Sequence, residues 1–151
     1  MRKLKLYLDG CCLNRPFDDI TQDKLRFECE AVLAILKSCE EGIWDVVRSD
    51  VLDDEIERTT DLVKKLKLIM MCSSTSVRLT LDNEMVKRAR ELQATADLNS
   101  YDALHLACAE QSEADILLTT DKEFLDKAKG SDARVRVANP AIWLMEEMFS
   151  D

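Results

Sequence analysis

The sequence predicts an α/β protein built on a mostly parallel sheet. Short segments with the periodicity of strands alternate with longer segments of helical periodicity along the whole chain. Hydrophobic residues make up 46% of the 151 residues, whereas there are only 3 Gly and 2 Pro, and no linker or internal repeat is present. We therefore expect one domain over residues 1–151.

The first half of the chain contains three predicted strands. Each is a short apolar run or an alternation of apolar and polar residues, and they cover residues 4–8, 43–48 and 77–81. Asn14, Pro16 and Asp18 break the first strand pattern into a loop. The predicted helices have apolar positions at helical spacing or a capping residue: residues 21–41 before Gly42, a short helix capped by Asp50 or Asp53, and a helix capped by Asp61.

The second half repeats the alternation with shorter strands. Residues 116–118 and 135–138 read as buried strands. The predicted helices are one capped by Asp82, one capped by Ser100, one over residues 121–129 ended by Gly130, and a last one with Pro140 in its first turn. Strands that alternate with helices in this way form a parallel sheet, and such sheets bind ligands beyond the carboxyl ends of their strands.

Charge and cysteine content narrow the function classes. The formal net charge is −9, which argues against binding of nucleic acid through a broad basic face. Six Cys lack the spacing of a redox motif or a zinc knuckle and predict reduced thiols. No segment approaches the roughly 20 apolar residues of a membrane span, and the N-terminus lacks the apolar core of a signal peptide, so we expect a cytoplasmic protein with no membrane contact.

Four acidic residues occupy the positions where a parallel sheet binds ligands. Asp9 ends the first strand and Asp121 follows the segment ILLTT, while Glu55 and Asp102 fall near helix starts. A helix N-terminus by itself favours an acidic residue, so Glu55 and Asp102 have an alternative explanation. Carboxylates that gather at one edge repel one another unless a divalent cation neutralises them, and Mg²⁺ or Mn²⁺ prefers such oxygen ligands.

Four segments, in their order and spacing, carry a resemblance to a known family. They are YLDGCCLNRPFDD, SDVLDDEIE, YDALHLACAE and ADILLTTDKEF. With these segments the chain strongly resembles the PIN domain family over nearly its whole length, and it looks closest to the VapC-like toxins of prokaryotic toxin–antitoxin pairs. The resemblance implies a three-layer α/β/α sandwich with a mostly parallel five-stranded sheet, and a Mg²⁺- or Mn²⁺-dependent endoribonuclease.

The resemblance also assigns roles to individual residues. It implies that Asp9, Glu55, Asp102 and Asp121 are the catalytic, metal-holding acids, with Glu123 as a possible further ligand. The sequence departs from the family pattern at Gly10 and Cys11, where relatives usually carry hydroxyl or amide side chains that would orient the metal ligands. Thr119, Thr120 and Asn14 could compensate for that loss. Arg15, in the loop beside Asp9, is the basic residue expected to contact a substrate phosphate or an antitoxin carboxylate, and Asn14 and Thr120 are assigned to the same binding surface.

Other residues and functions offer alternatives to these assignments. His105 lies three residues after Asp102 on the same helix face, but a packed or hydrogen-bonded structural role is the expectation for it. The segment carrying Trp143, Met145 and Phe149 is expected to pack in the core or to form a homodimer surface, as the family often pairs. The expected partners are an RNA substrate and a cognate antitoxin. The alternatives are a PIN nuclease of RNA processing outside a toxin pair and a binding module weakened at Gly10.

Overall fold

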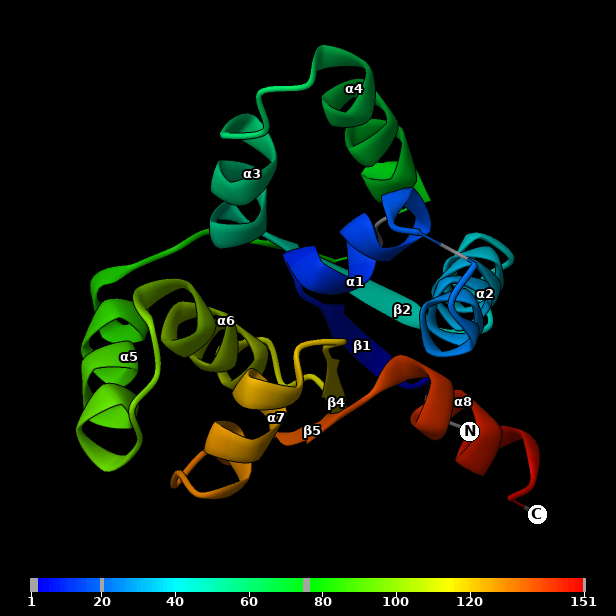
Figure 1. Cartoon of the computed structure of the whole chain (residues 1–151). Helices are drawn as coiled ribbons and strands as arrows, with labels where there is room; N and C mark the ends of the chain where they lie inside the picture. Colours follow the sequence, from blue (N-terminus) through cyan, green and yellow to red (C-terminus); the bar gives the residue numbers. More distant parts are fainter. Residues whose placement is uncertain (1–2, 20, 75–76, 151) are drawn as a thin grey trace.

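The structure, a computed structural model, describes residues 3–19, 21–74 and 77–150. The remaining positions of the predicted domain, residues 1, 2, 20, 75, 76 and 151, lie outside the described residues. The elements, in chain order (Figure 1), are β1 (Lys5–Leu8), α1 (Gly10–Asn14), the 3-10 helix η1 (Arg15–Phe17), α2 (Asp23–Glu40), β2 (Asp45–Ser49), α3 (Asp50–Glu57), α4 (Leu62–Met71), the 3-10 helix η2 (Cys72–Ser74), β3 (Val77–Leu79), α5 (Asn83–Thr95), α6 (Ser100–Gln111), β4 (Ile116–Leu118), α7 (Lys122–Lys129), β5 (Arg136–Ala138) and α8 (Pro140–Met148).

The five strands form one sheet in the order β3-β2-β1-β4-β5, and all four pairings are parallel. The predicted fold class is thereby confirmed. The chain adds β2 and β3 on one side of β1 and then β4 and β5 on the other. The connections therefore reverse direction between β1 and β4, which is where sheets of this kind form a crevice at their carboxyl ends.

The central strands are buried on both faces, as expected of a parallel sheet covered by helices. Tyr7 and Leu117 face a core formed with α5, α6 and α7. Leu6, Leu8 and Leu118 face a second core formed with α1, α2, α4 and α8. Figure 1 shows these two groups of helices on opposite sides of the strands, so the molecule has three layers.

Several predicted helix caps are confirmed and others shift by one residue. Asp61 and Asp82 cap α4 and α5 through the predicted side-chain oxygens. Ser49, rather than Asp50 or Asp53, caps α3, and Asn99, rather than Ser100, caps α6. The reason is that any short polar residue can cap a helix, so that neighbouring candidates are hard to distinguish from the pattern alone.

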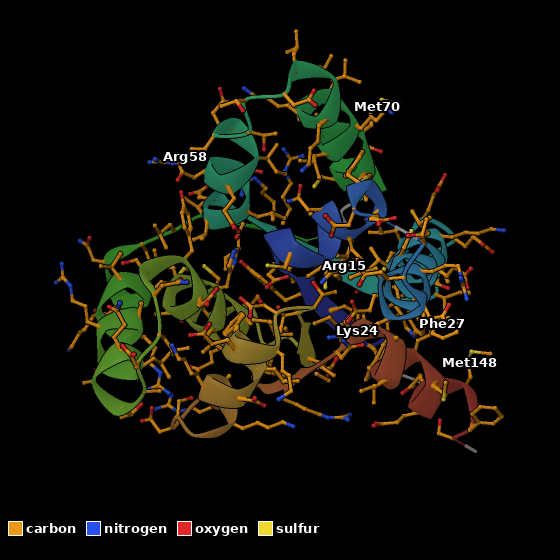
Figure 2. All side chains as sticks on the ribbon, viewed as in Figure 1. Arg15, Lys24, Phe27, Arg58, Met70 and Met148 are labelled. Atoms are coloured by element: carbon orange, nitrogen blue, oxygen red, sulfur yellow. The ribbon has the colours of Figure 1, made fainter. Side chains whose placement is uncertain are left out.

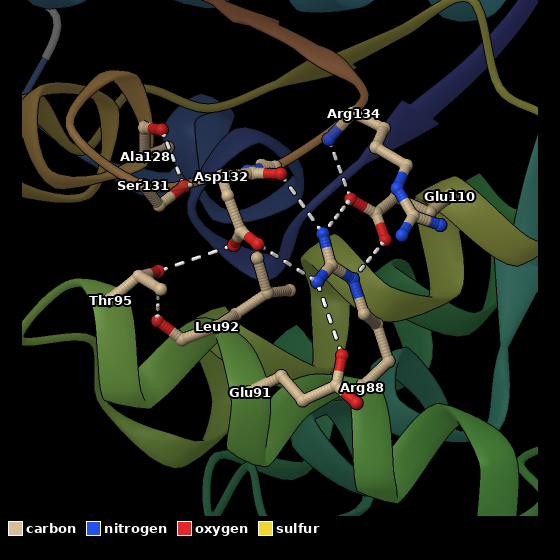
Figure 3. Close-up of polar contacts among 10 residues, drawn as sticks. Arg88, Glu91, Leu92, Thr95, Glu110, Ala128, Ser131, Asp132 and Arg134 are labelled. Carbon is tan, nitrogen blue, oxygen red and sulfur yellow. Dashed lines mark hydrogen bonds and ion pairs between the residues drawn. The ribbon is translucent and has the colours of Figure 1, made fainter.

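A polar cluster ties α5 and α6 to the loop before β5 (Figure 3). Arg88 of α5 makes two hydrogen bonds to the Glu110 carboxylate of α6, at 2.7 and 3.1 Å. Its guanidinium also donates to the Asp132 carbonyl at 3.0 Å, and the Arg134 amide donates to Glu110 at 2.6 Å. The Arg88 side chain is only 14% exposed, so this arginine joins structural elements and does not form an open basic surface.

Apolar side chains remain exposed on α2 and α8. Trp143 is buried against Trp44, with ring centroids 5.0 Å apart, so the expectation that it packs in the core is confirmed. Phe27, Met145 and Phe149 are exposed and line a groove of about 620 Å³ between the two helices. Figure 2 labels Phe27 on α2 and Met148 on α8, the two helices that border this groove.

Two further features concern the cysteines and the lengths of the helices. All six cysteines are free, and five of them are buried. None of the helices in the described ranges has the length and apolar character needed to cross a membrane.

Candidate active site

Asp9 and Asp121 stand at the carboxyl ends of the neighbouring strands β1 and β4. Asp9 caps α1, where its carboxylate accepts a hydrogen bond from the Cys12 amide at 3.0 Å. Asp121 caps α7 and accepts from the amides of Glu123 and Phe124 at 3.0 and 3.3 Å. Both acids therefore end a strand and begin a helix, which directs their side chains toward the crevice between β1 and β4.

Burial and the neighbouring charges perturb Asp9. Asp9 is only 2% exposed, and this burial raises the pKa of its carboxyl to about 6. The His105 ring, a hydrogen bond from the Thr119 hydroxyl and the Cys12 amide lower that pKa, while the charge of Glu55 raises it. The Thr119 hydroxyl oxygen also accepts from the Asp121 amide at 3.1 Å, so one side chain links the two strand-end acids.

Asp102 joins the same group from the first turn of α6. Burial raises the pKa of its carboxyl to about 7, and the charges of Asp9, Asp121 and Glu55 add to this rise, with His105 opposing. Acidic residues at positions 9, 55, 102 and 121 thus act on one another electrostatically, although they come from four segments of the chain. The structure brings together all four acids that the sequence singled out.

Cys11 lies among these acids. Cys11 is partly exposed, but desolvation by the surrounding protein raises the pKa of its thiol to about 12, and the four carboxylates each raise it further. This environment disfavours the thiolate, which is the nucleophilic form of cysteine.

Glu55 is held by a side chain that the sequence analysis assigned to no catalytic step. The Glu55 carboxylate is hydrogen-bonded to Nε2 of His105, which is buried in α6. His105 Nδ1 lies 2.6 Å from the Tyr7 hydroxyl, and that hydroxyl lies 2.7 Å from the Ser49 hydroxyl. His105 is therefore the hydrogen-bonded structural histidine that was expected, but its partner is one of the four acids.

Gly10 provides the space in which Glu55 lies. A Cβ atom at position 10 would stand 2.8 Å from Glu55 Oε2, closer than nonbonded atoms approach, and 3.1 Å from Oε1, so the Glu55 carboxylate would have to move. In the sequence alone, Gly10 indicates the loss of a polar side chain. In the structure, the absence of a side chain is what allows Glu55 to approach the residue next to Asp9.

The four acids are of the ligand type, carboxylate oxygen, that a divalent cation such as Mg²⁺ or Mn²⁺ prefers. Within the described ranges, no lysine or arginine forms an ion pair with Asp9, Asp102 or Asp121, so the electrostatic repulsion within the group is uncompensated by a protein cation. A pocket of about 240 Å³ lies beside Asp102 and Asp121. As the side chains stand, no three acidic, histidine or cysteine residues of the described part are close enough together to ligate one ion. A cation would thus need the carboxylates to rotate toward it.

The remaining predicted site residues have different surroundings. Glu123 lines the pocket, and its ion pair with Lys127 at 2.8 Å lowers the pKa of its carboxyl. The Asn14 side-chain amide donates to the Gly10 carbonyl at 2.8 Å. The Thr120 hydroxyl oxygen is buried and makes no hydrogen bond within the described part of the chain.

Arg15 is engaged within the protein. Its guanidinium pairs with Glu28 of α2 at 3.2 Å and with Asp18 at 2.8 Å, and its side chain is 16% exposed. Figure 2 places Arg15 between α1 and α2. The sequence predicted a phosphate or an antitoxin carboxylate as the partner of Arg15, not Glu28. Glu28 is 13 residues away on another helix, so no local sequence pattern indicates this ion pair.

Comparisons with known proteins agree with this architecture. The family model described as the PIN domain matches residues 7–130, a range that contains all four acids. The crystal structure of PAE2754 from Pyrobaculum aerophilum is similar, with a TM-score of 0.58 and 16% identity over 96% of each chain. So is VapBC2 from Rickettsia felis bound to a DNA fragment from its promoter, with a TM-score of 0.59 and 15% identity over 90% of this chain and 98% of the other. A search of curated proteins finds no match.

Proposed function

The chain belongs to the PIN domain family, whose members are generally nucleases, and from this premise we propose that it is a Mg²⁺- or Mn²⁺-dependent endoribonuclease and the toxin of a toxin–antitoxin pair. The observation that carries the proposal is the group of four carboxylates at the carboxyl ends of β1 and β4. The pKa values of Asp9 and Asp102 are raised to about 6 and about 7, chiefly by burial and then by neighbouring acids. Perturbed carboxyls of this kind, gathered at a crevice, are typical of catalytic sites.

Each acid has a proposed task. Asp9, Asp102 and Asp121 hold the cation through their carboxylate oxygens, and Glu55 completes the group from the side of α3. The chemistry that a bound divalent cation supplies is activation of a water molecule and neutralisation of charge on the phosphate. The amides at the starts of α1 and α7 each donate to one carboxylate oxygen of Asp9 and Asp121, which limits the conformations of these side chains before a cation binds.

The proposed reaction is hydrolysis of an RNA phosphodiester that leaves a 5′ phosphate and a 3′ hydroxyl. No side chain acts as nucleophile, in agreement with the raised pKa of the Cys11 thiol. The likeness in fold to VapBC2 and the loop and helix segments quoted above support the assignment to a toxin–antitoxin pair, with an antitoxin protein and a second copy of the chain as partners.

The test is cleavage of a pooled structured RNA by protein freed of any bound antitoxin, in Mg²⁺, in Mn²⁺ and in EDTA. We expect cuts that require the cation and carry 5′ phosphates. The Asp9→Asn, Asp102→Asn double variant should lose at least 100-fold in rate, in line with removal of metal ligands. The matched control is Asp23→Asn, Asp126→Asn, which removes two exposed carboxylates that form only surface ion pairs, and it should cleave as the wild type does.

Other outcomes would contradict the proposal at different levels. Cleavage that persists in EDTA would exclude the metal-dependent mechanism. No cleavage by folded wild-type protein in either cation would favour the binding module with a weakened site. Cleavage without a neighbouring antitoxin gene would favour an RNA-processing nuclease.

A further inference from the structure

A chain of buried hydrogen bonds connects the two ends of α3 through the interior of the protein. It runs from Ser49, the cap of α3, through Tyr7 of β1 to His105 of α6, and returns to Glu55 near the C-terminal end of α3. Ser49 and Tyr7 are fully buried and His105 is 1% exposed. Only the Glu55 end reaches the crevice, with a side chain that is 27% exposed.

Donor and acceptor roles along this chain follow from chemistry. An ionised carboxylate can only accept, so His105 Nε2 donates to Glu55. In the neutral ring, Nδ1 then accepts from the Tyr7 hydroxyl, which in turn accepts from the Ser49 hydroxyl. The Ser49 oxygen still accepts from the Leu52 amide at 3.1 Å. Nε2 carries a proton in both the neutral and the protonated ring, so the hydrogen bond from His105 to Glu55 has the same direction in either charge state of the histidine.

Two other segments lie next to the Glu55 carboxylate. His105 of α6 is hydrogen-bonded to it, and Gly10 lies so near that an added Cβ would stand 2.8 Å from Glu55 Oε2, so a side chain at position 10 would displace the carboxylate. A glutamate free to rotate loses side-chain entropy on ordering, and the charges of the other acids would push it toward solvent. The hydrogen bond from His105 opposes both effects.

We propose that His105, supported by Tyr7, is a positioning residue that holds the Glu55 carboxylate against Gly10, beside Asp9, so that four acids rather than three face the cation. The proposal rests on the proposed function for its effect on cleavage. Its structural part, a directed hydrogen bond from Nε2 to Glu55, can be tested without any activity.

The structural part can be read from nitrogen NMR, because His105 is the only histidine of the sequence. A two-bond ¹H–¹⁵N spectrum of the metal-free protein then contains one imidazole and needs no assignment. We expect a protonated Nε2 whose proton exchanges slowly with water. Gly10→Ala should displace Glu55 and make that proton exchange at least tenfold faster. The matched control is Gly130→Ala, whose added Cβ makes only ordinary contacts at 3.6 and 3.9 Å and should leave the spectrum unchanged.

The functional part uses Mn²⁺ alone as the probe, with its affinity measured by calorimetry. His105→Leu should weaken Mn²⁺ binding about tenfold, in the range known for residues that orient metal ligands. His105→Gln keeps an N–H donor near the position of Nε2 and should stay within about threefold of the wild type. His105→Leu in a Glu55→Gln background should cost no more than Glu55→Gln alone, because the histidine acts through the glutamate.

Three results would overturn the inference. They are a proton on Nδ1 with a bare Nε2, losses of Mn²⁺ affinity that add up in the double variant, and a His105→Gln variant as weak as His105→Leu. If His105→Leu does not fold, Tyr7→Phe and Gly10→Ala replace it, since each leaves the imidazole in place. If the wild type cuts no RNA, the proposed function fails while the nitrogen spectrum and the Mn²⁺ affinities still decide this inference. If it cuts RNA but the double-variant losses add up, the inference fails and the nuclease stands.

Discussion

Asp9→Asn should make the metal-free protein more stable at alkaline pH. Burial and the Glu55 charge raise the pKa of Asp9 from its ordinary value of 3.8 to about 6. Between these two pH values the folded protein therefore binds more protons than the unfolded chain. The stability that the protonated Asp9 contributes is lost as the pH rises from about 4 to 6. Asparagine has the same shape, keeps an oxygen for the Cys12 amide and carries no charge to desolvate.

The size of the effect follows from the shift. A rise of the Asp9 pKa from 3.8 to about 6, at about 1.36 kcal/mol for each tenfold change in proton affinity, corresponds to about 3 kcal/mol of destabilisation once Asp9 is ionised. This value is the upper limit of the free energy of unfolding that Asp9→Asn can gain at pH 8. At pH 5 the unfolded carboxyl is already ionised and the folded one is not, so roughly half of this cost is present. The stability advantage of the variant should grow by about 1.4 kcal/mol between pH 5 and pH 8. Any effect of the uncharged asparagine on stability is the same at both pH values and does not change this difference.

Urea unfolding followed by circular dichroism, in EDTA, measures this difference. The control is Asp97→Asn, which changes a fully exposed carboxyl and should shift stability equally little at both pH values. A stability advantage for Asp9→Asn that stays constant or shrinks from pH 5 to pH 8 would refute the reasoning, because it would mean that Asp9 carries no uncompensated charge in the folded protein.

Three further predictions concern the cation and the buried ion pairs. Mn²⁺ at 100 times its Kd should stabilise the wild type by about 2.7 kcal/mol in thermal melts and stabilise Asp9→Asn much less, and an equal gain in both would place the cation elsewhere. Arg15→Ala should lower the free energy of unfolding by about 3 kcal/mol in urea, since the buried Glu28 carboxylate loses its cation, and the loss should be smaller in a Glu28→Gln background. Arg88→Ala should cost about 2–3 kcal/mol by leaving Glu110 unpaired while RNA is cut at the wild-type rate, and an unchanged melting temperature would contradict its structural role.

The pattern of strands and helices could be predicted from the sequence because its signals are local. The alternation of Leu4, Leu6 and Leu8, the caps at Asp61 and Asp82, and the buried segment of residues 116–118 each depend on a few adjacent residues. The structure confirms these elements with small shifts at their ends. Helix ends are the least certain feature because neighbouring polar residues compete for the same capping position.

The four acids could be proposed for the same reason. In a parallel sheet the carboxyl ends of all strands lie at one edge, so Asp9 and Asp121 had to share it once the sheet was predicted. The structure adds that Glu55 is near enough to raise the pKa of Asp9, and that Asp9, Asp121 and Glu55 are near enough to raise the pKa of Asp102. Their roles as metal ligands stay predictions.

The sequence by itself determined the order of elements, the layered α/β architecture and the positions of the acids, because periodicity, capping and strand ends are properties of neighbouring residues. Only the tertiary structure decided which distant side chains meet. Glu55 and His105 are 50 residues apart, and His105 and Tyr7 are 98 residues apart. The pairing of Arg15 with Glu28 and the space that Gly10 leaves for Glu55 are of the same kind. Helical or strand periodicity shows which face of an element is buried but not what lies against it, and that depends on the order β3-β2-β1-β4-β5 in which the strands assemble.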